Sequence, residues 1–265
     1  MQIIQDIVTE YKEAWRFRYV IQSFVSTKLK QRYRRSFLGY FWTILAPFMH
    51  YAIIGFVMSH ISRSSMPNYF VYMFSGSVFF SVIAGVINGS PMYLLANEHF
   101  IKKIYLPKVI FVLNTVALEF VNFALTAVSL VLLGMVTKLI HFSMAFFYLP
   151  LPIIFGMLLL TGLGCVISIA AVYFRDLIHI LPAIMQAAFF LTPILYSIDM
   201  IPVEYHKFIY INPIYYMIEC FRMPIVHGEI PPLSYTLALI GISIFTFILG
   251  MVMLKKYDNK IVFRL

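Results

Sequence analysis

Charged residues are scarce in this chain. They make up 12% of its 265 residues, and only 11 residues are acidic. Soluble domains average about 25% charged residues and about half apolar ones, whereas 62% of this chain is hydrophobic. A single globular core cannot enclose so much apolar surface. The composition therefore excludes an ordinary soluble domain and predicts an integral membrane protein with lipid around it.

The residues that support catalysis, metal binding or disulfide bonding are also few. Of the two cysteines, Cys165 falls in the fourth apolar run and Cys220 in the external segment 199–232, so we expect no disulfide between them. No G-x-x-x-x-G-K-[ST] loop, H-E-x-x-H or G-x-S-x-G motif occurs, and the seven histidines lack metal-ligand spacing. We therefore expect no enzyme, no metal site and no cofactor bound by this chain.

Long apolar runs are what the chain has instead. A membrane-spanning helix needs about 20 apolar residues. Six runs reach that length, and they cover roughly residues 37–59, 69–96, 109–136, 144–172, 177–198 and 233–254. They predict an all-α protein with six transmembrane helices in a domain of residues 37–254, and with both termini on one side of the membrane.

The basic residues are distributed unevenly between the two sides of this arrangement. Sixteen of the 20 Lys and Arg residues fall on the side of the termini, in residues 1–36, the loop 97–108, the turn at Arg175 and the tail 255–265. Cytoplasmic loops carry such an excess, so we expect both termini in the cytoplasm of a multi-pass protein. The net charge of +9 is then a signal of orientation, and we expect no nucleic-acid partner.

Residues 1–36 differ from the six apolar runs. Apolar residues such as Phe17, Ile21 and Phe24 recur there at nearly helical spacing among Lys, Arg, Gln and Ser. This pattern is typical of an amphipathic helix in the membrane interface. The alternative is a solvated basic segment that leads into the first span.

The segment 199–232 is too apolar for an ordinary external loop. Prolines at 202, 213, 224, 231 and 232 divide it into pieces of about 10 residues, which are too short to span a bilayer. Asn212-Pro213 matches a helix N-cap followed by proline at the first helical position. We therefore predict two short re-entrant helices, which must be covered by protein or line a water-filled cavity.

The predicted third span carries a polar stripe. Its residues follow at intervals of four and three and lie within an arc of about 80° on a helix; they are Thr115, Glu119, Asn122, Thr126 and Ser129. An ionisable residue at mid-membrane is costly and suggests function, so the stripe fits the lining of a wet path. Hydrogen bonding between packed helices explains it equally well.

The predicted first span has an aromatic face. Its residues include Phe37, Tyr40, Phe41, Phe48 and Tyr51. Aromatic rings stack on the apolar faces of sugars, which would suit a polymer that slides past them. The alternative is an aromatic belt or packing against lipid.

Four motifs, in order along the chain, carry a family resemblance. They are the segment LKQRYRRSFLGYFW at 29–42 with Pro47, KKIYLPK at 102–108, Phe174-Arg175-Asp176, and TPILY at 192–196 with Asn212-Pro213 and Arg222. Together they resemble ABC exporter permeases of the O-antigen and capsular polysaccharide class, over nearly the whole chain.

The resemblance implies a type-2 ABC exporter permease fold and a set of partners. Two copies of the permease would form a homodimeric conduit with two separate ATPase subunits, which would bind ATP and Mg. The complex would move a lipid-linked polysaccharide across the bacterial inner membrane. A permease for teichoic acid or another lipid-linked glycan would have the same skeleton. A membrane-embedded transferase would need a catalytic cluster of His, Asp or Glu, which the sequence does not show. A third alternative is a stand-alone channel, which would work without a nucleotide-hydrolysing partner.

The resemblance and the residue patterns assign three sets of functional residues. The conduit set is Tyr40, Phe41, Phe48, Tyr51, Thr115, Glu119, Asn122 and Thr126. The exit set is Tyr196, Tyr215, Tyr216 and Arg222. The ATPase-contact set is Glu98, Lys102, Lys103, Pro107, Arg175 and Asp176.

Overall fold

The computed structural model describes residues 16–32, 39, 41–61, 69–103, 106–137, 140 and 143–264. The regular structure in these residues is entirely helical, as the apolar runs predict. The α-helices are α2 (Arg18–Arg32), α3 (Phe41–Ile61), α4 (Tyr69–Gly89), α5 (Met92–Leu95), α6 (Glu98–Lys103), α7 (Val109–Thr137), α8 (Pro150–Tyr173), α9 (Leu177–Leu191), α10 (His206–Ile211), α11 (Pro213–Val226) and α12 (Leu233–Arg264). Three short 3-10 helices are η1 (Met144–Tyr148), η2 (Ile198–Met200) and η3 (Val203–Tyr205).

Four of the predicted spans have the length and apolarity that a membrane crossing needs. These are α4, the Val109–Leu132 part of α7, η1 with α8 over Met144–Tyr173, and Leu233–Asp258 of α12. The described apolar part of α3 covers only Ile44–Ile54, and α9 has 15 residues. Four spans are thus confirmed by length and composition, and the first and fifth spans stay predictions.

The fifth apolar run forms a shorter helix than its composition suggests. The run extends to residue 198, but α9 ends at Leu191 and is followed by the irregular segment Thr192–Tyr196. Pro193 explains the end, because a residue before proline disfavours the helical conformation. Thr192 accordingly has extended dihedral angles.

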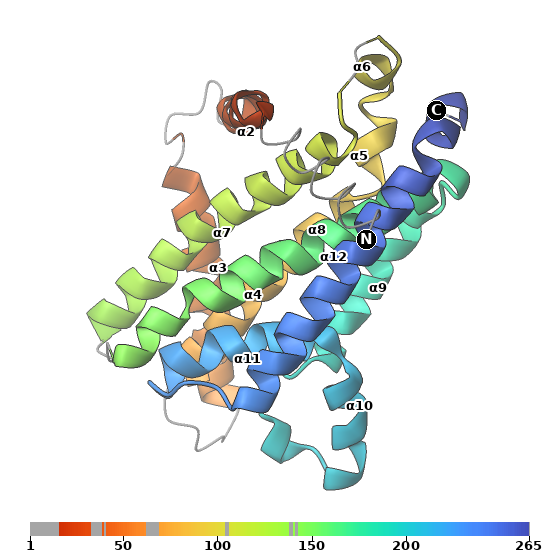
Figure 1. Cartoon of the computed structure of the whole chain (residues 1–265). Coiled ribbons are helices and arrows are strands. Elements are labelled where there is room, and N and C mark those ends of the chain that lie inside the picture. Colours follow the sequence, from red (N-terminus) through yellow and green to blue (C-terminus); the bar gives the residue numbers. More distant parts are fainter. Residues whose placement is uncertain are drawn as a thin grey trace.

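The long helices run side by side in a bundle (Figure 1). One end of the bundle carries α2, α6, the α8–α9 turn and the C-terminal end of α12, and the opposite end carries α10 and α11 (Figure 1). The segments rich in Lys and Arg therefore meet at one end. That this end faces the cytoplasm stays a prediction from the charge distribution.

Among the described helices, α8 and α12 have the most extensive contact. Two glycines permit it. A Cβ atom on Gly162 would collide with the backbone of Thr246, and one on Gly250 would collide with the backbone of Gly162. Small residues let helices in a membrane approach until their backbones touch. These two glycines therefore set the distance between α8 and α12.

The helix α4 lies at the centre of the bundle and contacts α7, α8, α9 and α11. Phe79 in the middle of α4 packs against Phe123 of α7 and Phe221 of α11, with ring centroids 5.4 and 4.9 Å apart. The aromatic contacts bring α11 against the middle of α4 and not only against its end.

The two cysteines, Cys165 of α8 and Cys220 of α11, are both buried, and no disulfide joins them.

Three contacts fix the segments at the basic end. Helix α2 packs on α7, and Phe24 of α2 meets Phe100 of α6 edge-on at 5.9 Å. Lys108, just before α7, is buried and forms an ion pair with Asp258 of α12. Residues 255–264 continue α12 as helix, so the predicted tail is joined to the bundle.

Candidate functional site

The irregular segment Thr192–Tyr196 and the start of α11 are held together by side chains. The Thr192 hydroxyl donates to the carbonyl oxygen of Ala188 at 2.8 Å and accepts from Nδ2 of Asn212 at 2.9 Å. Oδ1 of Asn212 accepts from the backbone N–H of Ile214 at 3.0 Å. Asn212 is thus the N-cap of α11 with Pro213 at the first position, which confirms the prediction from the Asn-Pro pair.

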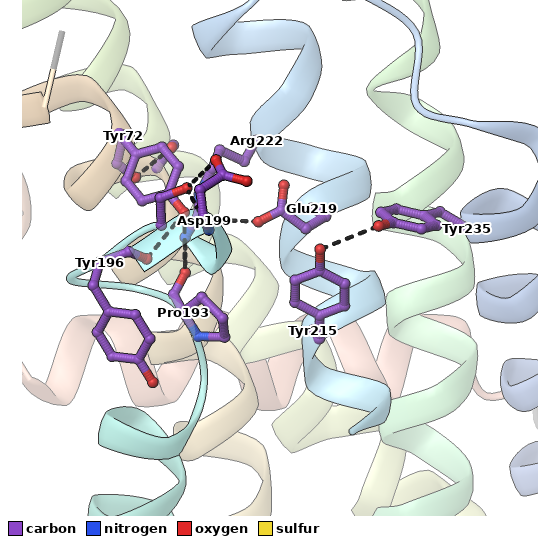
Figure 2. A network of polar contacts seen from close by, with 10 residues as sticks. Tyr72, Pro193, Tyr196, Asp199, Tyr215, Glu219, Arg222 and Tyr235 are labelled. Atoms are coloured by element: carbon purple, nitrogen blue, oxygen red, sulfur yellow. Dashed lines mark hydrogen bonds and ion pairs between the residues drawn. The ribbon is translucent and has the colours of Figure 1, made fainter. Parts of the chain in front are cut away.

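Arg222 of α11 is the centre of the network (Figure 2). It is 0% exposed, the largest of the fully buried side chains. Its Nη2 donates to the carbonyl oxygen of Pro193 at 2.8 Å, and its Nη1 pairs with Oε1 of Glu219 at 2.6 Å. The guanidinium also lies 3.8 Å from the ring centroid of Tyr72 in α4. One cation therefore links α4, α11 and the segment after α9.

Tyrosines of α4 complete the hydrogen bonding of that segment. The Tyr72 hydroxyl donates to the carbonyl oxygen of Tyr196 at 3.1 Å, and the Tyr69 hydroxyl donates to that of Leu195 at 2.8 Å. Buried carbonyl groups outside helices and sheets need such partners. Gly76, one turn further along α4, leaves the space for Arg222, because a Cβ atom there would collide with Nη2.

A cluster of tyrosine rings lies beside this network. The Tyr215 and Tyr235 hydroxyls are 3.2 Å apart and hydrogen-bonded (Figure 2), and the rings of Tyr210, Tyr215, Tyr216 and Tyr235 meet edge-on. Tyr216 donates to the carbonyl oxygen of Tyr210 at 2.7 Å. The structure therefore brings the predicted exit residues together on and around α11.

Burial divides these exit residues. Arg222 and Tyr215 are buried, while Tyr196 and Tyr216 are half-buried. The Tyr196 hydroxyl is also engaged, since it donates to the carbonyl oxygen of Phe190 at 2.7 Å. In this conformation Arg222 and Tyr215 can position their neighbours but cannot touch a passing molecule.

The polar stripe of α7 is turned toward α4. A Cβ atom on Gly85 would lie 2.8 Å from Oε2 of Glu119, and Nδ2 of Asn122 donates to the same oxygen at 3.3 Å. The hydroxyls of Thr115 and Thr126 donate to the carbonyl oxygens of Phe111 and Asn122. This geometry matches the helix-packing interpretation for Glu119, and lining of a path by this face stays a prediction.

The aromatic face of the first span is described only in part. Tyr40 lies outside the described residues, and of Tyr51 only the backbone, which belongs to α3, is described. Phe41 and Phe48 are 53% and 37% exposed. Phe41 and Phe48 are thus accessible on the surface of a single chain, and their part in lining a conduit stays a prediction.

The predicted ATPase contact gathers at the basic end. Glu98 and Lys102 of α6 form an exposed ion pair at 2.6 Å, Lys103, Arg175 and Asp176 are exposed, and Pro107 is buried. The hydrogen bond from Lys102 lowers the pKa of the Glu98 carboxyl, and the charges of His99 and Arg175 act in the same direction. The exposed charges of α6 and of the α8–α9 turn thus lie at the same end of the bundle (Figure 1).

Several residues that form long-range contacts could not be predicted from the sequence. Tyr72 and Gly76 are separated from Arg222 by more than 140 positions, and nothing in the α4 sequence distinguishes them from its other aromatic and small residues. Glu219 could have been found, because an acid three residues before an arginine on a helix is a pairing signal. Lys108 and Asp258 carry no such local signal.

Comparison with known proteins covers most of the chain. The family model for ABC-2 type transporters matches residues 19–226. The O-antigen export system permease protein RfbA of Klebsiella pneumoniae is 30% identical over 225 residues, which are 82% of this chain and 87% of that protein. Its namesake in Myxococcus xanthus is 25% identical over 236 residues, covering 88% and 90%. The polysialic acid transport protein KpsM of Escherichia coli is 21% identical over 245 residues, covering 92% and 94%.

Proposed function

Because the chain belongs to the ABC-2 type transporter family, we propose that it is the permease subunit of an ATP-driven exporter of lipid-linked polysaccharide. The carrying observation is the similarity, over most of the chain, to permeases named for O-antigen and polysialic acid transport. The cargo would be a glycan of the O-antigen or capsular kind, and the membrane would be the bacterial inner membrane. The chain is a transport subunit and not an enzyme.

In this proposal α3 and α9 complete six spans. At 1.5 Å per residue, the 15 residues of α9 extend only about 22 Å. The segment Thr192–Tyr196 would supply the remaining depth. Irregular backbone is tolerated there only when protein covers it, and the buried residues Thr192, Pro193 and Ile194, with their partners on α4 and α11, meet that condition.

The helices α10 and α11 would be the two re-entrant helices at the external mouth. The contact between Phe221 and Phe79 supports this for α11, because Phe79 lies halfway along a membrane-spanning helix. Glu219 and Arg222 would then be charges at membrane depth, and their mutual pairing is the usual way such charges are tolerated.

The energy for transport would come from other subunits. The sequence has no phosphate-binding loop, so ATP and Mg would bind to two ATPase subunits beneath a permease homodimer. The exposed surface made by Glu98, Lys102, Lys103 and Arg175 would receive them. The conduit would form between the two permeases, with the aromatic residues of α3 and the α7 stripe as the proposed lining.

Co-expression with a partner ATPase subunit tests the function. The expected result is a stable complex of both proteins whose ATP hydrolysis depends on lipid-linked glycan, and export of that glycan in cells that lack their own permease. An ion-conducting chain that is stable alone and never binds an ATPase would contradict the proposal. Export of a teichoic acid in place of an O-antigen or capsular glycan would change the cargo and leave the transport class intact.

A further inference from the structure

The ends of α8 and α12 form a pocket at the basic end of the bundle. It is an open pocket of about 340 Å³, lined by Tyr173, Tyr257, Lys260 and Arg264. The two tyrosine rings meet edge-on, with centroids 5.9 Å apart. The Arg264 guanidinium lies 4.9 Å from the ring of Tyr173, and Nζ of Lys260 lies 5.8 Å from the ring of Tyr257. Two cations and two aromatic rings therefore converge on one space.

The described residues around this pocket give it positive charge without a compensating acid. Tyr257, Lys260 and Arg264 follow at intervals of three and four and share an arc of about 60° on α12. The nearby Asp258 pairs instead with Lys108 on α7. None of the described carboxylates forms an ion pair with Lys260 or Arg264. The pocket is thus suited to an anion.

The depth of the pocket identifies the kind of anion. The candidate spans of α8 and α12, defined by length and composition, extend to Tyr173 and Asp258, so the two tyrosines lie at the ends of these spans, where aromatic belts occur. With a rise of 1.5 Å per residue, the Cα atoms of Lys260 and Arg264 lie about 3 and 9 Å beyond that boundary. The polar headgroups of a bilayer occupy about 5–7 Å on each side of the hydrocarbon. The Cα atom of Lys260 falls within this layer, and that of Arg264 falls just outside it while its guanidinium reaches back to the Tyr173 ring.

We propose that Tyr173, Tyr257, Lys260 and Arg264 bind the phosphate of an anionic phospholipid headgroup. Arg264, stacked on Tyr173, would present its guanidinium edge to the phosphate oxygens, a geometry that favours paired hydrogen bonds. Lys260 would add a second charge, and the tyrosine rings would cover the glycerol. Basic pockets between helices on the cytoplasmic side are typical sites for such lipids. This lipid would stay with the permease and is distinct from the exported cargo.

Native mass spectrometry of the purified full-length chain, titrated with phosphatidylglycerol or with neutral phosphatidylethanolamine, tests the site. We expect one phosphatidylglycerol to be retained in preference to phosphatidylethanolamine. The double variant Lys260→Gln/Arg264→Gln should bind that lipid about thirtyfold more weakly. Each basic residue near an anionic membrane surface raises the affinity roughly fivefold, and the two effects multiply. The control Lys28→Gln/Lys30→Gln removes the same charge from exposed positions of α2 and should retain the lipid.

Three results would overturn the proposal. Equal binding of the two lipids would show that the site does not recognise an anion. Equal loss of lipid in the α2 control would show that net charge, and not this pocket, holds it. Unchanged lipid binding in the Lys260→Gln/Arg264→Gln variant, together with failure to co-purify the ATPase subunit, would make the pocket a protein contact. The Lys260→Gln/Arg264→Gln variant should keep the thermal midpoint of the wild-type chain, which shows that its loss of lipid is not a loss of fold.

Discussion

At the scale of single residues, Arg222 carries the strongest structural consequence. Its guanidinium satisfies the Pro193 carbonyl group and neutralises Glu219 in the same buried place. Removing one partner of a buried ion pair leaves the other uncompensated, which costs about 3–5 kcal/mol. Arg222→Gln should therefore lower the stability of the purified permease by that amount, as measured by its thermal unfolding in detergent.

Two comparisons make the Arg222 prediction specific. Lys207→Gln removes an exposed cation on α10 and should leave the thermal midpoint nearly unchanged. The double variant Glu219→Gln/Arg222→Gln removes both charges and should recover part of the lost stability, because no charge is left buried without a partner. If the double variant is no more stable than Arg222→Gln, the ion pair is not the source of the effect.

Glu119 gives a second prediction at this scale. Its carboxylate lies against Gly85 and accepts from Asn122, and glutamine has the same size and keeps an acceptor oxygen. Glu119→Gln should leave the free energy of unfolding within about 1 kcal/mol of the wild-type value. It should reduce export if the charge acts in a path. Full export with a marked loss of stability would assign Glu119 to helix packing alone.

At the scale of elements, the contact between α8 and α12 depends on Gly162. A methyl group there meets the backbone of Thr246, which cannot move aside as a side chain can. Gly162→Ala should therefore separate the helices and destabilise the permease by several kcal/mol or prevent its assembly. Folded yield and thermal unfolding measure this directly.

Gly241 provides the matched control for Gly162. It also lies within α12, and a Cβ atom there would meet nothing within 4 Å. Alanine favours a helix interior over glycine by roughly 0.5–1 kcal/mol, so Gly241→Ala should be neutral or slightly stabilising. Similar losses for both variants would mean that α12 tolerates alanine poorly in general and that close approach is not the cause.

The helix α6 is the element where a motor subunit would act. Lys102→Ala and Lys103→Ala remove exposed charges and should leave the permease folded while they weaken coupling between ATP hydrolysis and export. The ratio of glycan exported to ATP hydrolysed is the measurement. Because the pKa of Glu98 is lowered by Lys102, the ion pair should persist above that pKa and be lost only as the pH falls through it. An unchanged ratio in both variants would remove these lysines from the contact.

At the scale of the whole molecule, orientation can be tested with cysteine labelling. Cys165 and Cys220 are buried, so the wild-type chain should react weakly with a membrane-impermeant thiol reagent. Lys207→Cys should be labelled from outside intact spheroplasts, whereas Lys28→Cys and Lys256→Cys should be labelled only after the membrane is opened. Labelling of all three from outside would refute the cytoplasmic assignment of the termini.

Much of the architecture could be predicted from the sequence, because the signals were local. Apolar runs of 20 or more residues gave four of the spanning helices, and the Asn212-Pro213 pair gave the start of α11. The end of α9 at Leu191 was missed because a hydropathy pattern continues through Pro193 although the helix does not.

The candidate site was predicted only in part, because its contacts are long-range. The place of Arg222 at an exit stays a prediction, and the structure shows it fully buried and in contact with Tyr72, Gly76 and Glu219. Which aromatic and small residues of α4 face α11 is decided by the packing of helices far apart in sequence. The same is true of Glu119, whose neighbour Gly85 lies on another helix.

The contact at Gly250 has a mechanical consequence for the longest helix. It divides α12 into two unequal parts, which extend about 12 Å to Asp258 and about 22 Å to Tyr235 at 1.5 Å per residue. Asp258 is tied to the entrance of α7 and Tyr235 to the tyrosine cluster. If α12 turns about this contact as a rigid rod, a sideways displacement of 1 Å at Asp258 becomes roughly 2 Å at Tyr235.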